Sequence, residues 1–260
     1  MKKFVGLSLL VAMATLAAMN GAYAQAAKNP FNLPNYGAVK KAKSDTRSTQ
    51  FYNSVMPTFS TFIDKSLKEA SQFKTAPEYV LDPTRLYLPL STLQPVRVYF
   101  LHEGAGYRNQ LGVAIVDAGH GRNGASVLID PLSQGKLIFE DASFELTQIK
   151  DKKGKVTSES GGLSKGDYVE IGHISAGKQV DFFLPSDGAN GTKNLLRNFK
   201  ELNSDGLQHV IAVYFKDTHP GYVLIGFEDI VGGGDLDYND TLFVVDFGYD
   251  ITIDKEDLPH

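Results

Sequence analysis

The sequence predicts a mainly β protein, in which an antiparallel β-sandwich or jelly roll carries an N-terminal helical extension. The first indication is a series of short apolar runs after residue 95, with a period of about two residues. The second is the punctuation of these runs by Gly, Asn and Asp, in a chain that contains 25 glycines. Many short strands separated by such turns are typical of two packed sheets.

The strands are expected where the apolar runs are densest. The segment Asp151-Lys152-Lys153-Gly154 is typical of a hairpin loop between two of them. Residues 195–202 are instead expected to form a short helix over one end of the sandwich. The predicted strands cover residues 96–101, 111–117, 126–129, 137–139, 143–149, 168–171, 179–184, 208–215, 222–227 and 241–247.

The first 24 residues have the features of a secretory signal peptide. Lys2 and Lys3 precede an apolar run over residues 4–18, and the Ala-Tyr-Ala of residues 22–24 is a small-x-small cleavage site. An uncleaved membrane anchor is the alternative, but the run is shorter than the roughly 20 residues that a span needs. We therefore expect export to the extracellular space or cell surface, with the periplasm as an alternative, and no membrane span after cleavage.

The composition of the remaining chain favours some partners over others. Without the two lysines of the leader, 24 basic residues stand against 30 acidic ones, a formal charge of 24 − 30 = −6. This balance argues against nucleic acid as a partner and favours cations. The sequence has no cysteine, so disulfides are excluded and bound metal is one route to extra stability.

The N-terminal part differs from the sandwich in its periodicity. Residues 25–43 are polar and predict an extended or mobile arm. Apolar residues then recur at helical spacing, and Pro57 fits the first turn of a helix over about 58–73. This helix either packs on its own domain, which we favour, or docks on a partner. The expected division is a signal peptide at 1–24, an extension at 25–82, a sandwich domain at 83–250 and a tail at 251–260.

The segment 226–240, GFEDIVGGGDLDYND, holds the densest set of oxygen ligands in the chain. Its three consecutive glycines let the backbone turn tightly between two predicted strands. Alternating residues of such a loop can point inward together and share one ion. Calcium prefers six to eight oxygen ligands of this kind. The candidate calcium ligands in the segment are Glu228, Asp229, Asp235, Asp237, Asn239 and Asp240.

A solvated acidic loop without an ion is the alternative. Five carboxylates fall within 13 residues, and no Lys or Arg lies between Lys216 and Lys255 to offset their repulsion. The D-x-D-x-N spacing is like that of an EF-hand, but Asp240 stands where that motif needs glycine and Asp246 where it needs glutamate. Magnesium and zinc fit less well, because the segment is flexible, rich in oxygen ligands and free of His and Cys.

Two segments, GFEDIVGGGDLDYNDTLF at 226–243 and HEGAGYRNQLG at 102–112, occur in the order of a known signature. Together they resemble the bacterial family called domain of unknown function 4114, over roughly residues 83–250. The resemblance implies a calcium-binding β-sandwich of secreted and surface proteins, including large adhesins with RTX repeats, and implies no enzymatic activity. It also implies that Glu103 and Asn109 of the earlier motif approach the same site.

No motif for catalysis or nucleotide binding is complete in the sequence. Gly104-Ala105-Gly106 begins like a dinucleotide fingerprint, but Asn109 stands at the third glycine position. The six histidines are scattered without ligand spacing. We therefore expect a protein that is not an enzyme.

Two functions remain open. The favoured one is a secreted calcium-binding sandwich with a structural or adhesive role in an extracellular matrix, a biofilm or a surface assembly. The alternative is calcium-dependent carbohydrate binding, because Tyr107, Tyr222 and Tyr238 lie beside the two motifs and tyrosines can stack on sugar rings. Such tyrosines can equally close the rim of the core. The expected partners are calcium and an extracellular glycan or a surface or matrix protein.

Overall fold

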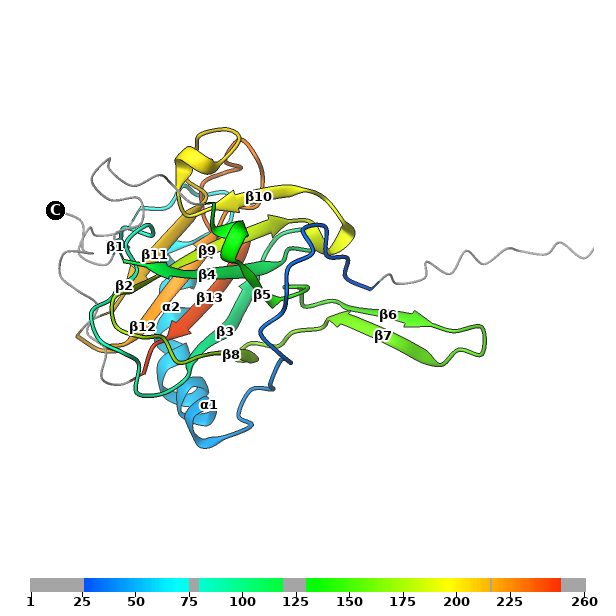
Figure 1. The fold of residues 1–260 in the computed structure, drawn as a ribbon, viewed down its shortest axis with the longest axis horizontal. Coiled ribbons are helices and arrows are strands. Elements are labelled where there is room, and N and C mark those ends of the chain that lie inside the picture. The colour runs from blue at the N-terminus through cyan, green and yellow to red at the C-terminus, as the bar shows by residue number, and fades with distance from the viewer. Residues whose placement is uncertain (1–25, 75–79, 119–129, 216, 249–260) are drawn as a thin grey trace, which may run out of the picture.

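The computed structural model describes residues 26–74, 80–118, 130–215 and 217–248. They form a β-sandwich of two antiparallel sheets with helices against one of them (Figure 1). The fold class is the predicted one, mainly β with an N-terminal helical extension. The strands are β1 (Val80–Leu81), β2 (Tyr87–Leu88), β3 (Val96–Glu103), β4 (Leu111–Asp117), β5 (Lys136–Phe139), β6 (Leu146–Lys150), β7 (Val156–Gly161), β8 (Tyr168–Gly172), β9 (Lys178–Ser186), β10 (Asn194–Arg197), β11 (Val210–Tyr214), β12 (Tyr222–Phe227) and β13 (Thr241–Asp246).

The two main sheets differ in size and strand order. The larger has the order β1-β11-β12-β13-β3-β8, and the smaller has the order β10-β9-β4-β5, with β2 also paired to β9. β12 and β13 are antiparallel neighbours whose pairing begins at Phe227 and Thr241. Thr241 also pairs with Glu103 at the end of β3. The loop between β12 and β13 therefore lies at one end of the larger sheet, beside the end of β3.

The central strands of the larger sheet are buried on both faces. On β13, Phe243 and Val245 belong to the core between the sheets, whereas Leu242 and Val244 belong to a second core under the helices. Side chains still alternate between the faces. Both faces are apolar because both are covered, which is why β13 reads as a continuous apolar run.

A single helical segment covers the outer face of the larger sheet. Asp45 caps its start by accepting a hydrogen bond from the amide of Ser48 at 2.8 Å. Pro57 lacks the N–H that would bond to the preceding turn, and the helix widens directly before it. The segment consists of α1 (Thr46–Gln50), a π-helical turn (Phe51–Val55) and α2 (Met56–Ser66).

Aromatic and aliphatic contacts hold the helices on the sheet. The rings of Phe51 and Tyr99 stack with their centroids 3.8 Å apart, and Phe59 and Ile63 are buried in the same core. The favoured expectation of packing on its own chain agrees with these contacts. The helical segment begins and ends earlier than the predicted 58–73, because the backbone leaves helical geometry at Leu67.

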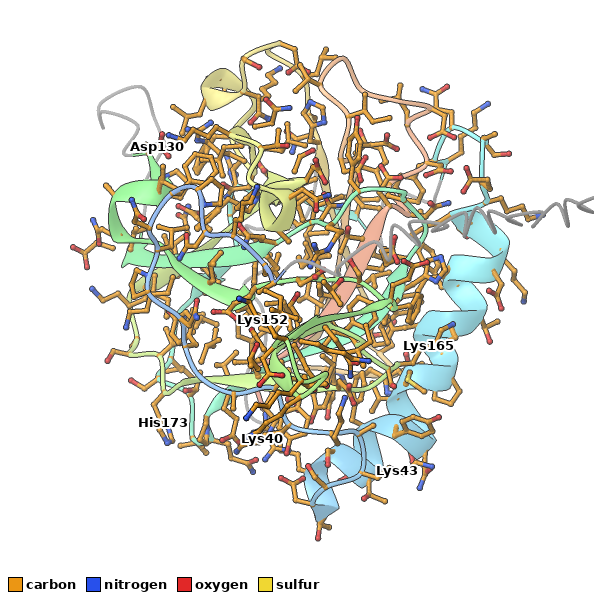
Figure 2. The ribbon with its side chains drawn as sticks, turned by 90° about the vertical axis from the view of Figure 1, so that its right-hand side faces the viewer. Lys40, Lys43, Asp130, Lys152, Lys165 and His173 are labelled. Carbon is orange, nitrogen blue, oxygen red and sulfur yellow. The ribbon has the colours of Figure 1, made fainter. Side chains whose placement is uncertain are left out.

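β6 and β7 form a hairpin that belongs to neither main sheet. The hairpin extends away from the sandwich (Figure 1). Its turn contains the predicted loop at 151–154, and Gly154 there has a φ of 80°, which favours glycine. Lys152 lies in this turn, on the side that faces the viewer in Figure 2.

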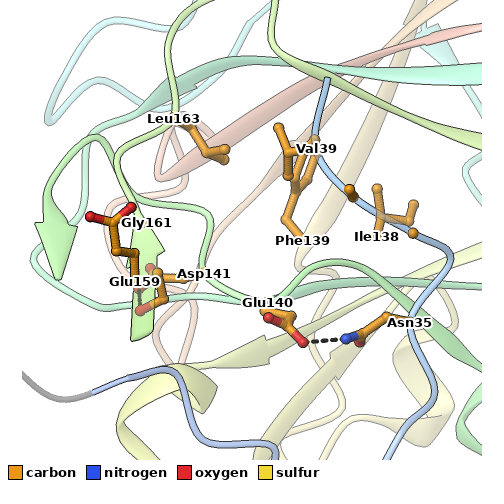
Figure 3. Close-up of a pocket in the computed structure, with 12 residues that line it drawn as sticks. Asn35, Val39, Ile138, Phe139, Glu140, Asp141, Glu159, Gly161 and Leu163 are labelled. Carbon is orange, nitrogen blue, oxygen red and sulfur yellow. Dashed lines mark hydrogen bonds between the residues drawn. The ribbon is translucent and has the colours of Figure 1, made fainter. Parts of the chain in front are cut away.

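The N-terminal arm lies in an extended conformation along the sandwich. Asn35 forms a parallel bridge with Leu137, and Leu33 packs against Leu137 and Phe183. The arm, β5 and β7 line a cavity of about 400 Å³ (Figure 3). Its lining includes apolar side chains such as Val39 and Phe139, and none of the residues of 226–240.

Local patterns predicted some strands well and others wrongly. β4 and β12 have the predicted bounds, whereas β1, β2 and β7 were not predicted. The predicted helix at 195–202 is wrong: Asn194–Arg197 is a strand paired with β9, followed by a 3-10 turn at Lys200–Leu202. Leu196 is buried in the sandwich core, so pairing and burial outweigh local helix propensity.

Some predictions fall outside the described residues. They are the signal peptide at 1–24, the strand at 126–129 and the tail at 251–260. Within the described ranges, none of the helices has both the length and the apolar character needed to cross a membrane.

Candidate functional site

Residues 228–240, here called the acidic loop, connect β12 to β13. The backbone has a positive φ at five positions of this loop: 102° at Gly232, 90° at Gly233, 52° at Gly234, 61° at Leu236 and 56° at Tyr238. Only glycine adopts this region without a steric cost, so the loop follows a tight and partly strained path. Gly234 also leaves room for Glu228, since a Cβ there would collide with the Glu228 carboxylate and force it to shift.

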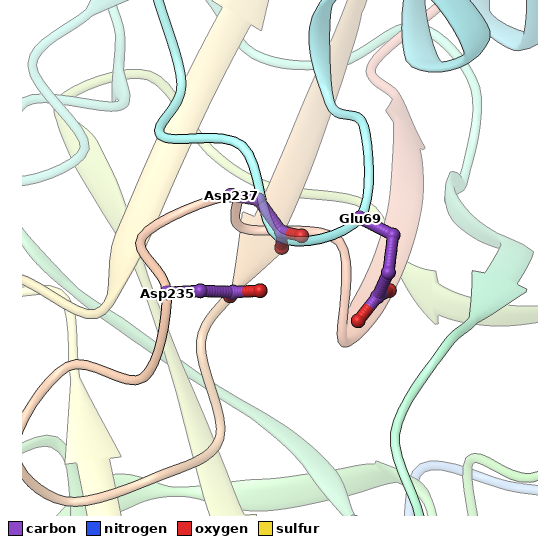
Figure 4. A group of neighbouring side chains, drawn as sticks. All are labelled: Glu69, Asp235 and Asp237. Carbon is purple, nitrogen blue, oxygen red and sulfur yellow. The ribbon is translucent and has the colours of Figure 1, made fainter.

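Three carboxylates converge beside the acidic loop and form what we call the three-carboxylate cluster. Asp235 and Asp237 come from the loop and Glu69 comes from the segment after α2 (Figure 4). One oxygen of each lies within 4.8 Å of the others. Asp237 is 1% exposed, whereas Glu69 and Asp235 are exposed. Oxygen ligands from two distant parts of the chain therefore surround one point.

Hydrogen bonds hold the segment after α2 against the acidic loop. The amide of Ala70 donates to Oδ2 of Asp237 at 3.0 Å. The amide of Phe73 donates to the carbonyl of Leu236 at 2.8 Å. Glu69 was not among the predicted ligands, because nothing in its sequence neighbourhood distinguishes it and only the tertiary contact brings it to the loop.

Glu228 is buried beside Gly234, and Oε1 accepts a hydrogen bond from the amide of Tyr238 at 2.7 Å. Burial raises the pKa of Glu228 to about 7; the charges of Asp237 and Asp235 act in the same direction, and the Tyr238 amide opposes them. Without a nearby cation, this carboxyl is therefore partly protonated at neutral pH. A cation would favour its charged form.

A second polar group lies where the loop joins the strands. The amide of Asp229 donates to Oδ2 of Asp240 at 2.8 Å, and Nδ2 of Asn109 donates to Oδ2 of Asp229 at 2.7 Å. Oδ1 of the fully buried Asn109 accepts the amide of Asp187 at 2.9 Å. Burial and the charge of Asp229 raise the pKa of Asp240 to about 8, and burial raises the pKa of Asp229. Asn109 thus links the 102–112 motif to the acidic loop.

The other two predicted ligands have different partners. Nδ2 of Asn239 donates to Oδ2 of Asp237 at 2.8 Å and to the carbonyl of Leu67 at 3.2 Å, so it orients the Asp237 carboxylate. Glu103 accepts the amide of Phe144 at 3.5 Å, and burial raises its pKa. Among the predicted ligands, the structure brings together Asp235 and Asp237, with Asn239 and Glu228 beside them. Asp229, Asp240 and Asn109 form the second group. Glu103 instead bonds to the neighbouring loop.

Within the described part of the chain, no Lys, Arg or His forms an ion pair with the carboxylates of the acidic loop or with Glu69. Carboxylates at this spacing repel one another, and burial increases the cost. The donors of the three-carboxylate cluster are all oxygens, as a hard cation such as calcium requires. The residues present therefore fit such an ion.

A cavity of about 300 Å³ opens beside the three-carboxylate cluster, between α2 and the end of β3. Glu69 and Asn239 line one part of it, and Ile63, His102 and Lys165 line others. Burial lowers the pKa of His102 and so favours its neutral form. The cavity thus combines an apolar wall with groups that can donate and accept hydrogen bonds.

No curated protein and no solved structure matches the chain. A family model matches residues 174–248, and its description is "Domain of unknown function (DUF4114)". The matched range contains the acidic loop and both strands that flank it, whereas the 102–112 motif and the rest of 83–173 lie outside it. Residues 174–248 of this chain therefore belong to the DUF4114 family.

Proposed function

We propose that the protein is an exported calcium-binding β-sandwich with a non-catalytic, structural or adhesive role in an extracellular matrix, biofilm or surface assembly. The observation that carries the proposal is the convergence of Glu69, Asp235 and Asp237, whose oxygens lie within 4.8 Å of one another. Among the described residues these carboxylates have no basic partner. A divalent cation is the simplest group that offsets their charge.

The character of the ligands favours calcium. Asp237 is held in place by hydrogen bonds from Ala70 and Asn239, so one ligand is preorganised. Asp235 and Glu69 are exposed and free to adjust, as the variable coordination of calcium allows. Water and backbone carbonyls would complete the coordination shell. Zinc would require His or Cys ligands, and the cluster offers neither.

Calcium bound here would act first on the stability of the fold. An ion shared by Glu69 and Asp237 would fasten the segment after α2 to the acidic loop. The helical layer would then be tied to one end of the larger sheet by an ion as well as by its apolar contacts. Extracellular calcium modules often have dissociation constants of about 10⁻⁴–10⁻³ M, a range in which extracellular calcium can act as a structural component.

Calcium titration by calorimetry tests this proposal on the chain from residue 25 onward. We expect a binding heat for the unaltered protein and a dissociation constant raised by about tenfold or more in Asp235→Asn, a loss of about 1.4 kcal/mol. The matched control is Asp217→Asn, an exposed aspartate near the opposite end of the larger sheet. The absence of a binding heat, or equal affinity in the protein and Asp235→Asn, would reject the site.

Calcium-dependent carbohydrate binding is the second candidate function. The observation that favours it is the cavity of about 300 Å³ beside Glu69 and Asn239. The tyrosines add less, since Tyr222 is buried in the core under the helices and only Tyr107 is well exposed, at 42%. A glycan array in calcium and in chelator separates the candidates: glycan retention that requires calcium favours the lectin, and calcium-dependent stability without retention favours the structural role.

A further inference from the structure

The β6–β7 hairpin contributes little to the folded core. None of its residues belongs to the three buried apolar clusters of the described structure. None of its cross-strand pairs joins two large apolar side chains, and two pairs are polar on both strands, Thr147 with Ser160 and Gln148 with Glu159. A two-stranded ribbon is only marginally stable in water. The need for a packed core therefore does not account for the hairpin.

The turn of the hairpin has a defined structure. Oδ1 of Asp151 accepts the amides of Lys153 at 2.8 Å and Lys155 at 3.0 Å. The amide of Asp151 donates to the carbonyl of Lys155 at 2.8 Å, and that of Gly154 donates to the carbonyl of Asp151 at 2.9 Å. The one acidic side chain of the turn is thus used to hold its backbone, where it presents the neighbouring lysines.

Four lysines surround this turn and none of them is neutralised. Residues 150–155, here called the basic tip, have a formal charge of 4 − 1 = +3 in a chain of net charge −4. All four lysine side chains are exposed. Among the ion pairs of the described residues, none involves them. The basic tip comprises Lys150, Asp151, Lys152, Lys153, Gly154 and Lys155.

The hairpin separates this positive charge from the acidic body. β6 has five residues, which at roughly 3.3 Å per residue extend about 16 Å. The Debye length in physiological salt is about 8 Å, so the carboxylates of the body are largely screened at the tip. Figure 1 shows the hairpin reaching away from both sheets. A polyanion can therefore approach the positive tip, although the net charge of the protein is negative.

We propose that the basic tip binds an anionic polysaccharide, one whose charges are carboxylates or sulfates. The hydroxyls of Thr147 and Ser158 lie farther along the two strands, where they can bond to sugar hydroxyls. Gln148 and Thr157 already donate within the hairpin, to Glu159 and to the carbonyl of Ile149. Lysines on flexible stems suit charges that are spread along a polymer. The proposal is independent of the calcium site, and gives the adhesive role a partner.

The composition of the hairpin disfavours other partners. Protein interfaces concentrate their binding energy in aromatic and Arg residues, whereas residues 151–155 are only Lys, Asp and Gly. Single-stranded nucleic acid is bound with aromatic stacking and Arg contacts, and residues 146–161 contain neither an aromatic residue nor an Arg. The hairpin thus offers a partner positive charge and hydroxyl groups that can hydrogen-bond to sugars, which are the features that an anionic polysaccharide requires.

Biolayer interferometry on the chain from residue 25 onward tests the proposal. The immobilised probes are polygalacturonate, dextran sulfate, neutral dextran and double-stranded DNA, all in EGTA so that calcium cannot bridge protein and polymer. The variant is Lys152→Glu/Lys153→Glu, and a milder one is Lys152→Gln/Lys153→Gln. The control, Lys193→Glu/Lys200→Glu, makes the same charge change at exposed lysines near β10. Melting curves establish that all variants are folded.

We expect binding to at least one of the two anionic polysaccharides and none to neutral dextran; the two anionic probes distinguish carboxylate from sulfate. The Glu variant should lose about tenfold or more in affinity, the Gln variant less, and the control little. Raising NaCl from about 50 to about 200 mM should weaken binding by roughly tenfold or more, since bound counterions are released from a polyanion. No binding to either polymer, an equal loss in the control, or DNA binding at least as tight would overturn the proposal.

Discussion

The carboxylates at the two ends of β13, the buried Asp246 and the half-buried Asp240, have opposite surroundings. At the C-terminal end, Asp246 is 1% exposed, and Arg47 approaches both of its oxygens, with Nε to Oδ2 at 2.9 Å and Nη2 to Oδ1 at 2.8 Å. At the N-terminal end, Asp240 accepts a hydrogen bond from the amide of Asp229, and no Arg of the described residues forms an ion pair with it. One strand thus has a carboxylate neutralised within the chain at one end and an uncompensated group at the other.

The same contrast extends to the neighbouring residues. Beside Asp246, Arg97 bonds to Asp45 at 2.7 Å and to Glu170 at 2.8 Å. The Arg97 guanidinium holds the pKa of Asp45 well below its usual range. Around the acidic loop the pKa values are raised instead, as at Glu228. At the arginine end, formed by Arg47, Arg97, Asp45, Glu170 and Asp246, basic residues of the chain itself neutralise the carboxylates. At the acidic loop, no basic residue of the described ranges does so.

The largest expected effect comes from Arg47→Met at the arginine end. Removing the guanidinium leaves the buried Asp246 unpaired, which should cost about 3–5 kcal/mol of the free energy of unfolding. Urea denaturation in calcium and in EGTA measures it, and the loss should be the same in both. The double variant Arg47→Met/Asp246→Leu should recover much of the loss, because it removes both charges. If Arg47→Met lowered the free energy of unfolding by less than about 1 kcal/mol, Asp246 would not depend on Arg47 for its neutralisation.

Removal of calcium is the next largest test, because it acts on the acidic loop alone. At a calcium concentration of about a hundred times the dissociation constant, the ion adds roughly 2.7 kcal/mol. For a chain of this size, that corresponds to a fall in melting temperature of roughly 5–10 °C in EGTA. Scanning calorimetry of Asp235→Asn should show a much smaller difference between calcium and EGTA. Identical melting curves of the unaltered protein with and without calcium would show that its stability does not depend on calcium.

The pH dependence of stability should have opposite signs at the two ends. A lowered pKa at Asp45 stabilises the fold above its unfolded pKa, and this stability is lost in acid below about pH 4. The raised pKa values of Glu228, about 7, and Asp240, about 8, stabilise the calcium-free fold in acid, and this stability is lost as pH rises from about 4 to 8.

In EGTA, the free energy of unfolding should therefore fall by on the order of 2 kcal/mol between about pH 5 and about pH 8. Glu228→Gln should flatten that slope, because the substituted side chain does not titrate. Saturating calcium should flatten it as well, because the ion favours the charged carboxylates. Urea unfolding at a series of pH values measures the slope. If the free energy of unfolding of the calcium-free protein rose between about pH 5 and about pH 8, the predicted direction of the pH dependence would be wrong.

Of the two ends of β13, only the acidic loop could be predicted from the sequence. The acidic loop could be recognised because its carboxylates are close together in the chain, with glycines that permit the turn. Arg47 and Asp246 lie 199 residues apart, so their pairing depends on the helical layer packing on β3 and β13. Glu69 was missed for the same reason.

Elements were predictable to the extent that they depend on local pattern. β4 and β12 alternate or run apolar over their whole length, and their bounds were predicted correctly. β10 depends on pairing with β9 and on the burial of Leu196, which no local pattern reveals. Local spacing thus indicated the candidate ligands of the acidic loop, whereas tertiary packing determined which distant residues lie beside each end.

The smallest expected effect is that of Glu69→Gln, which tests whether the ion also binds a residue outside the acidic loop. Glu69 is exposed, so its loss should leave the calcium-free stability almost unchanged. The dissociation constant for calcium should nevertheless rise by about tenfold, or about 1.4 kcal/mol, because one of three converging carboxylates loses its charge. Lys68→Gln, at the adjacent exposed position, is the control and should tighten binding slightly if it does anything. Hydrogen exchange of residues 67–73 should slow with calcium in the unaltered protein and less so in Glu69→Gln. Unchanged affinity in Glu69→Gln would confine the ion to the acidic loop, and the helical layer would then be held by its apolar core, by the arginine end and by hydrogen bonds, without help from the ion.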